Sequence, residues 1–324
     1  MKTCDICGTL NFKENNYCTH CGNKLIYEHF CPVCGQLNPD SAVFCVKCKS
    51  QINPVSIDEF DILFSEYNRN LLAEATITVD EYFQILSDIF KRADYIDIWG
   101  NTIKDKILNF AGIFTECRTK ARGYERGFIF LGNVIFYDDR LEDSVQIATI
   151  IHELGHFFLF SIIESLLCHI FNVKSSSTLQ SFVWYFLNLP EFKIMNEYCA
   201  HTVEGRFIPY GYQNYGSFNV LVESNDYDEE SLNNMIVLGN SFANEIIVYL
   251  EKYIDEDLRN DIKLQYKKDL IAPAYESIFK ETDDSFPIDL KNSVLLKLLY
   301  EVFCDISTEE INELDGIKSG IEIN

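Results

Sequence analysis

Residues 145–163 read VQIATIIHELGHFFLFSII and contain three ionisable side chains, those of His152, Glu153 and His156. The apolar residues recur at helical spacing and occupy every face rather than one stripe. A helix that is apolar all round is buried, so we expect this helix to form the centre of a globular domain. Buried ionisable groups need partners, so the three polar side chains are expected to share a common partner.

These three residues form the pattern His-Glu-x-x-His. Two histidines four positions apart lie one turn apart on the same helix face, so His152 and His156 can reach one ion. Glu153 flanks that face, where it can contact a metal-bound water. This is the arrangement of zinc peptidases, with the histidines as ligands and the glutamate as general base. The alternative interpretation is a pair of core histidines that are merely hydrogen-bonded.

A catalytic zinc usually has three protein ligands and an open position. The longer metzincin pattern is absent, because Leu159 and Ile162 stand where it needs Gly and His. A second helix is predicted to start at Pro190, because Pro is favoured in the first turn, and to end between Gly205 and Pro209. Its inner face carries the remaining candidates.

Glu197 is predicted as the third zinc ligand, with His201 one turn further along beside the site. Two alternatives stay open. His201 could itself bind zinc, or Glu164, two turns beyond His156 on the central helix, could supply the ligand.

The run Glu197-Tyr-Cys-Ala-His201 resembles the second-helix motif of gluzincin peptidases. The resemblance implies that Glu197 binds zinc and that the residue four positions on supports the site. This chain has His201 where Asp or Asn is commoner, so its implied role is to orient a ligand or to bind zinc. Residues 110–210 also distantly resemble ImmA/IrrE-type regulatory peptidases, which are intracellular enzymes that cleave transcriptional repressors. The 40 residues between His156 and Glu197 exceed the usual spacing in that family.

Eight of the twelve cysteines lie in the first 48 residues as four Cys-x2-Cys pairs, and the first two pairs superpose on the last two after a shift of 27 residues. Two such pairs complete a closed tetrahedral Cys4 zinc site, which is structural. So short a segment buries too little core to fold alone, and zinc supplies the missing free energy. The predicted sites are Cys4, Cys7, Cys18 and Cys21 for the first zinc, and Cys31, Cys34, Cys45 and Cys48 for the second.

The sequence Cys-Pro-Val-Cys-Gly at 31–35, with Asn-Pro-Asp at 38–40 and Phe-Cys-Val-Lys-Cys at 44–48, resembles the double zinc ribbon family. The resemblance implies a recognition or assembly module with a protein partner. His20 and His29 are expected to be bystanders, because each site already has four thiolates. A disulfide framework is the alternative, and a reducing cytoplasm disfavours it.

The predicted fold is mainly α with a small β-sheet, an α+β zincin-like domain, preceded by the two Cys4 zinc ribbons. The apolar runs 128–131 and 134–137 flank Gly132-Asn133 and predict a hairpin. Residues 109–119 are expected to add a strand, and the edge of strand 134–137 to hold an extended peptide. Asp139 and Glu142 resemble a capping box for the central helix. The predicted domains are residues 1–50, a linker at 51–58, and 59–324.

The net charge of −23 belongs to the large domain, because residues 1–50 carry five lysines against four acidic residues. This charge argues against a general nucleic-acid or anionic-membrane binder. The first residues are polar, unlike a secretory signal, and the longest apolar stretch, 157–173, is interrupted by Glu164 and His169. We therefore expect a cytoplasmic protein with neither membrane nor nucleic-acid partners.

The sequence thus predicts a zinc peptidase, with one catalytic and two structural zinc ions, that cleaves a protein or peptide recruited by the ribbons. Four residues after the second helix could stabilise an oxyanion: Arg206, Tyr210, Tyr212 and Tyr215. One alternative is a zinc-ribbon interaction or regulatory protein with an inactive peptidase-like domain, which the intact Glu153 disfavours. The other is a nucleic-acid-binding regulator, which the charge disfavours.

Overall fold

The computed structural model describes residues 2–3, 10–11, 28–30, 37–39, 47, 62–94, 98–120, 126–130, 134–213, 215–273 and 282–306. The chain divides into two compact units, Met1–Phe60 with Asn312–Glu322, and Asp61–Ile311 with Ile323–Asn324.

In the residues of the first unit that the structure describes, there are two small antiparallel strand pairs. β1 (Lys2–Thr3) pairs with β2 (Leu10–Asn11), and β3 (Glu28–Phe30) pairs with β4 (Leu37–Pro39). The register Thr3↔Leu10 becomes Phe30↔Leu37 after the 27-residue shift, so the repeat seen in the sequence recurs in the strand pairing. The eight predicted zinc-binding cysteines, His20 and the 51–58 linker lie outside the described residues.

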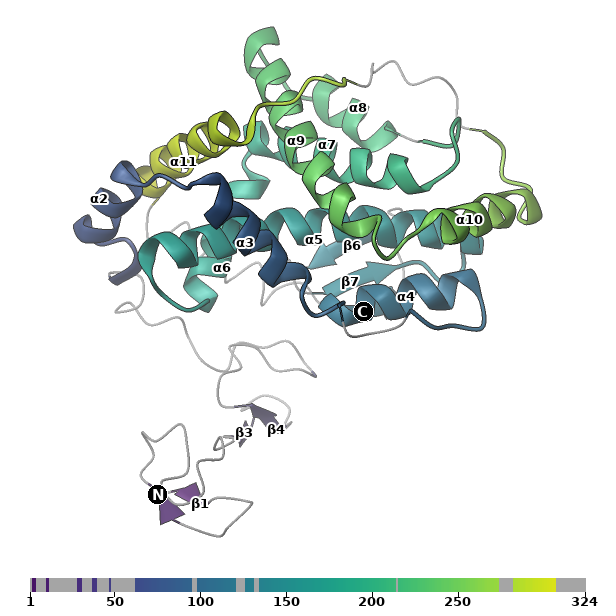
Figure 1. Ribbon diagram of the computed structural model, residues 1–324, viewed down its shortest axis with the longest axis horizontal. Coiled ribbons are helices and arrows are strands. Elements are labelled where there is room, and N and C mark those ends of the chain that lie inside the picture. The colour runs from purple at the N-terminus through teal and green to yellow at the C-terminus, as the bar shows by residue number, and fades with distance from the viewer. Residues whose placement is uncertain are drawn as a thin grey trace. The chain divides into compact units, whose positions relative to one another are not determined.

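The second unit is mostly helical with one small sheet (Figure 1). In chain order its elements are α2 (Glu66–Glu74), α3 (Val79–Phe90), α4 (Ile103–Phe114), β5 (Glu116–Thr119), β6 (Gly127–Phe130), β7 (Val134–Tyr137), α5 (Asp143–Phe171), α6 (Ser177–Asn188), α7 (Pro190–Phe207), α8 (Gly216–Glu223), α9 (Glu229–Leu250), α10 (Glu256–Lys268) and α11 (Ile288–Asp305). The predicted mainly α fold with a small sheet is confirmed.

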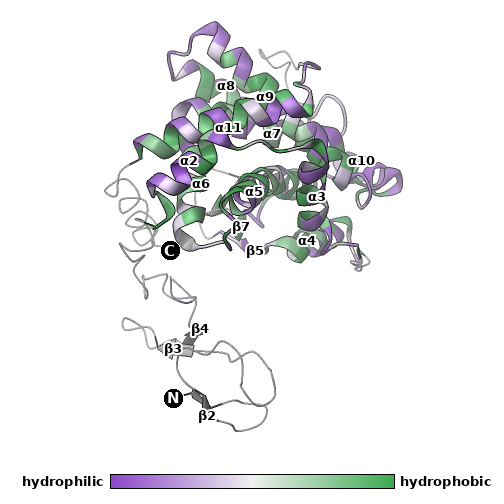
Figure 2. Cartoon of the chain, turned by 60° about the vertical axis from the view of Figure 1, so that its left-hand side comes forward, coloured by the Kyte–Doolittle hydropathy of each residue, from purple (hydrophilic) through white to green (hydrophobic). Residues whose placement is uncertain are grey.

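Helix α5 is the centre of this unit, as its apolar composition predicts. Figure 2 shows it nearly end-on, largely green, in the middle of the surrounding helices. It packs against α3, α4, α6, α7, α9 and α10 and against β6 and β7. By length and composition α5 could cross a membrane, but 61% of its most apolar window is buried inside the structure, as in the core helix of a globular domain.

The sheet has the strand order β5-β7-β6. β6 and β7 pair antiparallel with Phe130 opposite Val134, which confirms the predicted hairpin, whereas β5 runs parallel to β7. The predicted strand at 109–119 is wrong for its first half. A capping box formed by Thr102 and Asp105 starts α4, whose inner face buries Phe110 and Phe114, and only residues 116–119 are extended.

The predicted peptide-binding edge at 134–137 is also wrong, because β7 is the central strand and is paired on both sides. A strand can add only to an open edge. Of the two outer strands, β6 is the one beside α5. The sequence could not rank the three strands, because their order depends on the parallel β5–β7 pairing.

The start of α5 is capped through a tertiary contact. The predicted box of Asp139 and Glu142 does not form, and the N-cap residue Glu142 makes no side-chain cap. Instead the Ser144 amide donates to Asp269 Oδ2 at 2.9 Å, from the residue that ends α10. An acceptor 125 residues away satisfies the exposed helix amide, which local sequence could not reveal.

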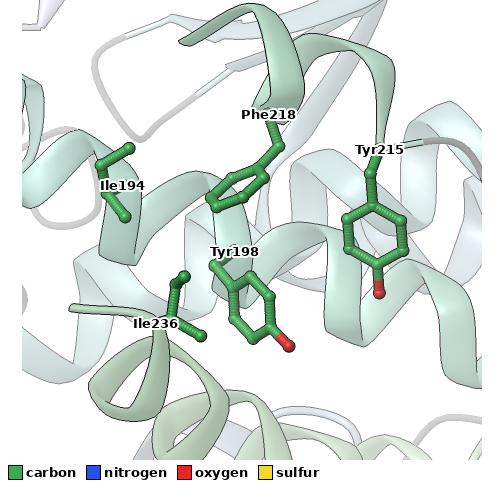
Figure 3. Close-up of a cluster of buried hydrophobic side chains, with 5 residues drawn as sticks. All are labelled: Ile194, Tyr198, Tyr215, Phe218 and Ile236. Atoms are coloured by element: carbon green, nitrogen blue, oxygen red, sulfur yellow. The ribbon is translucent and has the colours of Figure 1, made fainter. Parts of the chain in front are cut away.

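Helix α7 packs between α5 and α9. A Cβ on Gly155 would lie 2.8 Å from Ala200 Cα, so the two small residues allow α5 and α7 to approach closely. On another side of α7, a cluster of Ile194, Tyr198, Tyr215, Phe218 and Ile236 joins it to α8 and α9 (Figure 3). These contacts hold α7 and α8 in place beside the part of α5 that carries His152 and His156.

Candidate metal centre

His152 and His156 lie one turn apart on α5, as the spacing predicts. Their Nε2 atoms are 3.2 Å apart and their ring centroids 4.8 Å apart. Both rings are almost entirely buried, with 14% and 9% of their side-chain surfaces exposed. Two nitrogens bound to one tetrahedral zinc at about 2.0–2.1 Å would stand at roughly this separation. The pair is therefore spaced for a shared ion.

The opposite ring nitrogens are held by α7. His152 Nδ1 is 3.2 Å from Glu204 Oε2, and His156 Nδ1 is 2.7 Å from Asn196 Oδ1. Since the lower number on α5 pairs with the higher number on α7, the two helices run antiparallel. Partners at Nδ1 orient each ring and direct Nε2 to the common point, which is how metal-binding histidines are usually supported.

Glu197 completes this group. Its Oε2 lies 3.8 Å from His152 Nε2, and its Oε1 lies 3.9 Å from His156 Nε2. The structure therefore brings the predicted third ligand, one carboxylate between two imidazoles, to the same point as the histidines. Two nitrogens and one oxygen, with a cavity on the remaining side, fit a zinc ion with an open position.

His201 also belongs to this cluster. One ligand atom from each of His152, Glu197 and His201 lies within 4.8 Å of the others. However, His201 Nε2 is 2.8 Å from Ser217 Oγ, its Nδ1 is 3.5 Å from Glu204 Oε2, and its ring packs edge-on against His152. Both nitrogens thus have other partners, which suits a supporting role better than that of a ligand.

Glu204 is the group that sequence reasoning missed. Its buried carboxylate contacts the Nδ1 atoms of both His152 and His201. Burial alone would raise the pKa of Glu204, but the hydrogen bonds to the two histidines outweigh it and lower the pKa to about 2. A signal was present, because residues 197, 201 and 204 follow the i, i+4, i+7 spacing of one helix face. Asn196 gave no comparable signal.

Glu153 lies between α5 and the edge strand β6. It accepts a hydrogen bond from the Ile129 backbone, and a Cβ on Gly127 would come within 3.5 Å of its Oε1 and 2.4 Å of Thr149 Cγ2. Only glycine fits at 127, so the strand runs close over the carboxylate. Burial raises the pKa of Glu153 to about 7, and the charges of Glu197 and Glu204 add to this against the opposing effect of His152.

A cavity of about 490 Å³ opens onto these groups. One end is bounded by Arg126 and by β6, and the other by Phe160 of α5 and the end of α6. His152, Glu153, His156, Glu197, His201 and Glu204 all line it. A chain segment can therefore reach the metal centre from solvent.

The four residues considered for oxyanion stabilisation do not line this cavity. Arg206 pairs with Glu251, Tyr210 is 94% exposed, Tyr212 packs on Tyr266, and Tyr215 is buried in the cluster of Figure 3. Glu164, the alternative ligand, also lies outside it and accepts a hydrogen bond from Gln180. Helix α7 ends at Phe207, and in the segment that follows Tyr215 packs against the His201 ring, with ring centroids 5.1 Å apart.

Comparison with known proteins concerns the N-terminal unit. Residues 4–49 match the double zinc ribbon family, which supports zinc binding by the two cysteine sets. No curated protein and no solved structure matched the chain. Residues 4–49 are thus similar to double zinc ribbons, and the match does not extend to the residues that line the cavity.

Proposed function

We propose that the helical unit is a zinc-dependent peptidase whose metal is held by His152, His156 and Glu197. The observation that carries this proposal is the 3.2 Å approach of two imidazole Nε2 atoms, each with its Nδ1 engaged by α7. A pair of merely structural histidines has no need of a carboxylate facing both Nε2 atoms or of a cavity beside them.

The chemistry divides between the metal and Glu153. A bound zinc supplies a water of lowered pKa and polarises the scissile carbonyl. Glu153 accepts a proton from the attacking water and then donates it to the leaving amine nitrogen. Glu153 is suited to both transfers because its carboxylate lines the cavity beside the two histidines, where it can contact a metal-bound water.

The substrate is proposed to be an extended peptide lying along β6. Gly127, Phe128 and Ile129 line the cavity, and in the described part of the chain β6 pairs with β7 alone. An open strand edge binds an extended chain through backbone hydrogen bonds, so it positions a peptide without demanding one sequence. The zinc ribbons are proposed to recruit the protein that carries this peptide.

Metal analysis with one variant tests the function. The full chain should contain about three zinc ions, two in Cys4 ribbons and one in the helical unit. Glu153→Gln should keep all three and lose at least about 100-fold in the hydrolysis of a denatured protein, followed by mass spectrometry. Glu164→Gln is the matched control on the same helix and should hydrolyse like the parent. Two zinc ions in the parent chain, or full activity in Glu153→Gln, would contradict the proposal.

A further inference from the structure

The cavity extends past the metal centre toward the end of α6. Because α5 and α7 are antiparallel, His152 faces Glu204 and His156 faces Asn196. One further turn along each helix leads to Phe160 and Lys193, and both line the same cavity. This part of the cavity, bounded by Phe160, Trp184, Leu187, Asn188 and Lys193, is called the α6 end.

The wall of the α6 end is largely apolar. Phe160 and Leu187 are each only 3% exposed, and Trp184 is half-buried. Trp184 and Leu187 are three residues apart on α6 and so share one face. Asn188 fixes the end of this helix by donating its side-chain amide to the Trp184 carbonyl at 2.8 Å. Burying a leucine-sized side chain against such a wall removes apolar surface from water and so favours binding.

Lys193 supplies the charge at this end. It lies one turn before Glu197 on α7, and within the described residues it forms no ion pair. The other cation that lines the cavity, Arg126, stands at the opposite end beside β6. The positive charge of Lys193 acts on Glu197 without forming a salt bridge to it. Because Lys193 is half-buried at the cavity wall and makes no salt bridge within the described residues, its ammonium group is placed to receive a carboxylate from a ligand.

We infer, resting on the proposed peptidase function, that the α6 end binds a peptide residue with a large apolar side chain next to a carboxylate. The apolar wall takes the side chain and Lys193 takes the carboxylate. That carboxylate is either the side chain of an adjacent acidic residue or the free C-terminus of the peptide. The two sources share one chemistry and differ in whether cleavage is internal or terminal.

The chain has its own reporter for this site. It contains two tryptophans, Trp184 at the α6 end and Trp99, which is 69% exposed and does not line the cavity. A Trp99→Phe, Glu153→Gln full-length protein loaded with zinc therefore reports peptide binding through the fluorescence of Trp184 alone. With the proposed base removed, the peptides stay intact during titration.

The probes are blocked pentapeptides on an alanine scaffold. Three of them carry Leu-Glu, Leu-Gln or Ala-Glu at the centre. A fourth ends in Leu with a free C-terminal carboxylate, and the same peptide with a C-terminal amide is its control. We expect the Leu-Gln and Ala-Glu peptides to bind about tenfold more weakly than Leu-Glu. If the free-acid peptide binds more tightly than the Leu-Glu peptide, the carboxylate that Lys193 receives is the C-terminus. If it binds no more tightly, that carboxylate is the acidic side chain.

Lys193→Met keeps the apolar stem and removes the charge, so it should abolish the difference in affinity between the Leu-Glu and Leu-Gln peptides. Lys297→Met, on the exposed face of α11, is the matched control and should retain it. Leu187→Ala should reduce the difference in affinity between the Leu-Glu and Ala-Glu peptides. Equal binding of all peptides, no response of Trp184, or an unchanged Glu preference in Lys193→Met would overturn the inference.

Hydrolysis of the same peptides by the parent chain separates the two proposals. Selective binding without hydrolysis would leave the α6 end in place and remove the peptidase function. Hydrolysis without the Leu-Glu or Leu-carboxylate preference would keep the peptidase function and remove this subsite.

Discussion

Two groups of buried charges in the helical unit have opposite designs. The metal-site cluster, formed by His152, His156, Glu197, His201 and Glu204, faces a cavity. The Nε2 atoms of His152 and His156 and the carboxylate of Glu197 converge on one point. The Lys291 cluster, formed by Tyr82 of α3, Glu245 of α9 and Lys291 of α11, is closed. It does not line that cavity, and Lys291 is 0% exposed.

The Lys291 cluster satisfies its own charges. Glu245 accepts hydrogen bonds from both Lys291 and the Tyr82 hydroxyl, and Lys291 Nζ lies 3.6 Å from the Tyr82 ring centroid. Burial still lowers the pKa of Lys291 to about 8, because the loss of water outweighs the charge and hydrogen bond of Glu245. Burial of charged groups alone therefore does not mark a functional site. The metal-site cluster differs because its nitrogen and oxygen atoms converge beside a cavity.

The largest effect on stability is expected from a change in the Lys291 cluster. Glu245→Ala leaves Lys291 buried without its counter-ion and should lower the free energy of unfolding by about 3–5 kcal/mol. Urea denaturation of the full chain measures this. Glu301→Ala, which breaks the exposed Lys297–Glu301 pair, is the control and should cost less than about 1 kcal/mol. A cost for Glu245→Ala no larger than the control would show that the Lys291 cluster does not stabilise the fold.

The second-largest effect is expected in the metal-site cluster and concerns its zinc affinity. Glu204→Gln removes the charge behind His152 and should weaken zinc binding in the helical unit about 10–100-fold, because the ring loses its orienting carboxylate. Competition with a chelator measures this affinity. Glu191→Gln, in the exposed first turn of the same helix, should leave it unchanged. Unchanged zinc affinity in Glu204→Gln would mean that the imidazole of His152 needs no support from α7.

A smaller effect on the free energy of unfolding is expected at Asn292, the residue that follows Lys291. Its side-chain oxygen and nitrogen are buried and have no hydrogen-bond partner among the described residues. Asn292→Leu should therefore raise the free energy of unfolding by about 1 kcal/mol, because it removes buried polar atoms that lack partners. Thermal unfolding gives the sign. A fall in stability would indicate a partner for Asn292 outside the described residues.

The smallest effect on stability is expected at Glu197. In metal-free protein Glu197→Gln should change the free energy of unfolding by less than about 1 kcal/mol, because this carboxylate is partly exposed to the cavity. The same variant should hold one zinc ion fewer than the parent. If it is instead as destabilised as Glu245→Ala, the two clusters do not differ as proposed, and Glu197 is part of the structural core.

Local patterns were read correctly where helix geometry alone decides. The spacing of His152 and His156 follows from a repeat of 3.6 residues per turn. The burial of α5 follows from apolar residues on every face, and the start of α7 follows from the preference of Pro for the first turn. The hairpin of β6 and β7 follows from a short turn between two apolar runs. In each case the interacting residues are near neighbours in the chain.

Errors arose where the deciding contact is distant. Asp139 was the expected cap of α5, but Asp269 fills that role. Strand 134–137 was the expected peptide-binding edge, but the pairing with β5 makes it central. Residues 109–114 have apolar positions that suit either a strand or a helix, and the packing of Phe110 on Tyr253 and of Phe114 on Phe158 favours the helix.

The sequence by itself determined which groups could form a metal centre, because positions on one helix face are set by the regular backbone. It also determined the two cysteine sets, whose spacing repeats. Only the tertiary structure decided that Glu204 and Asn196 hold the histidines and that Glu153 lies under β6. The reason is that the close approach of α5 and α7 at Gly155 and Ala200 sets which turns of the two helices meet.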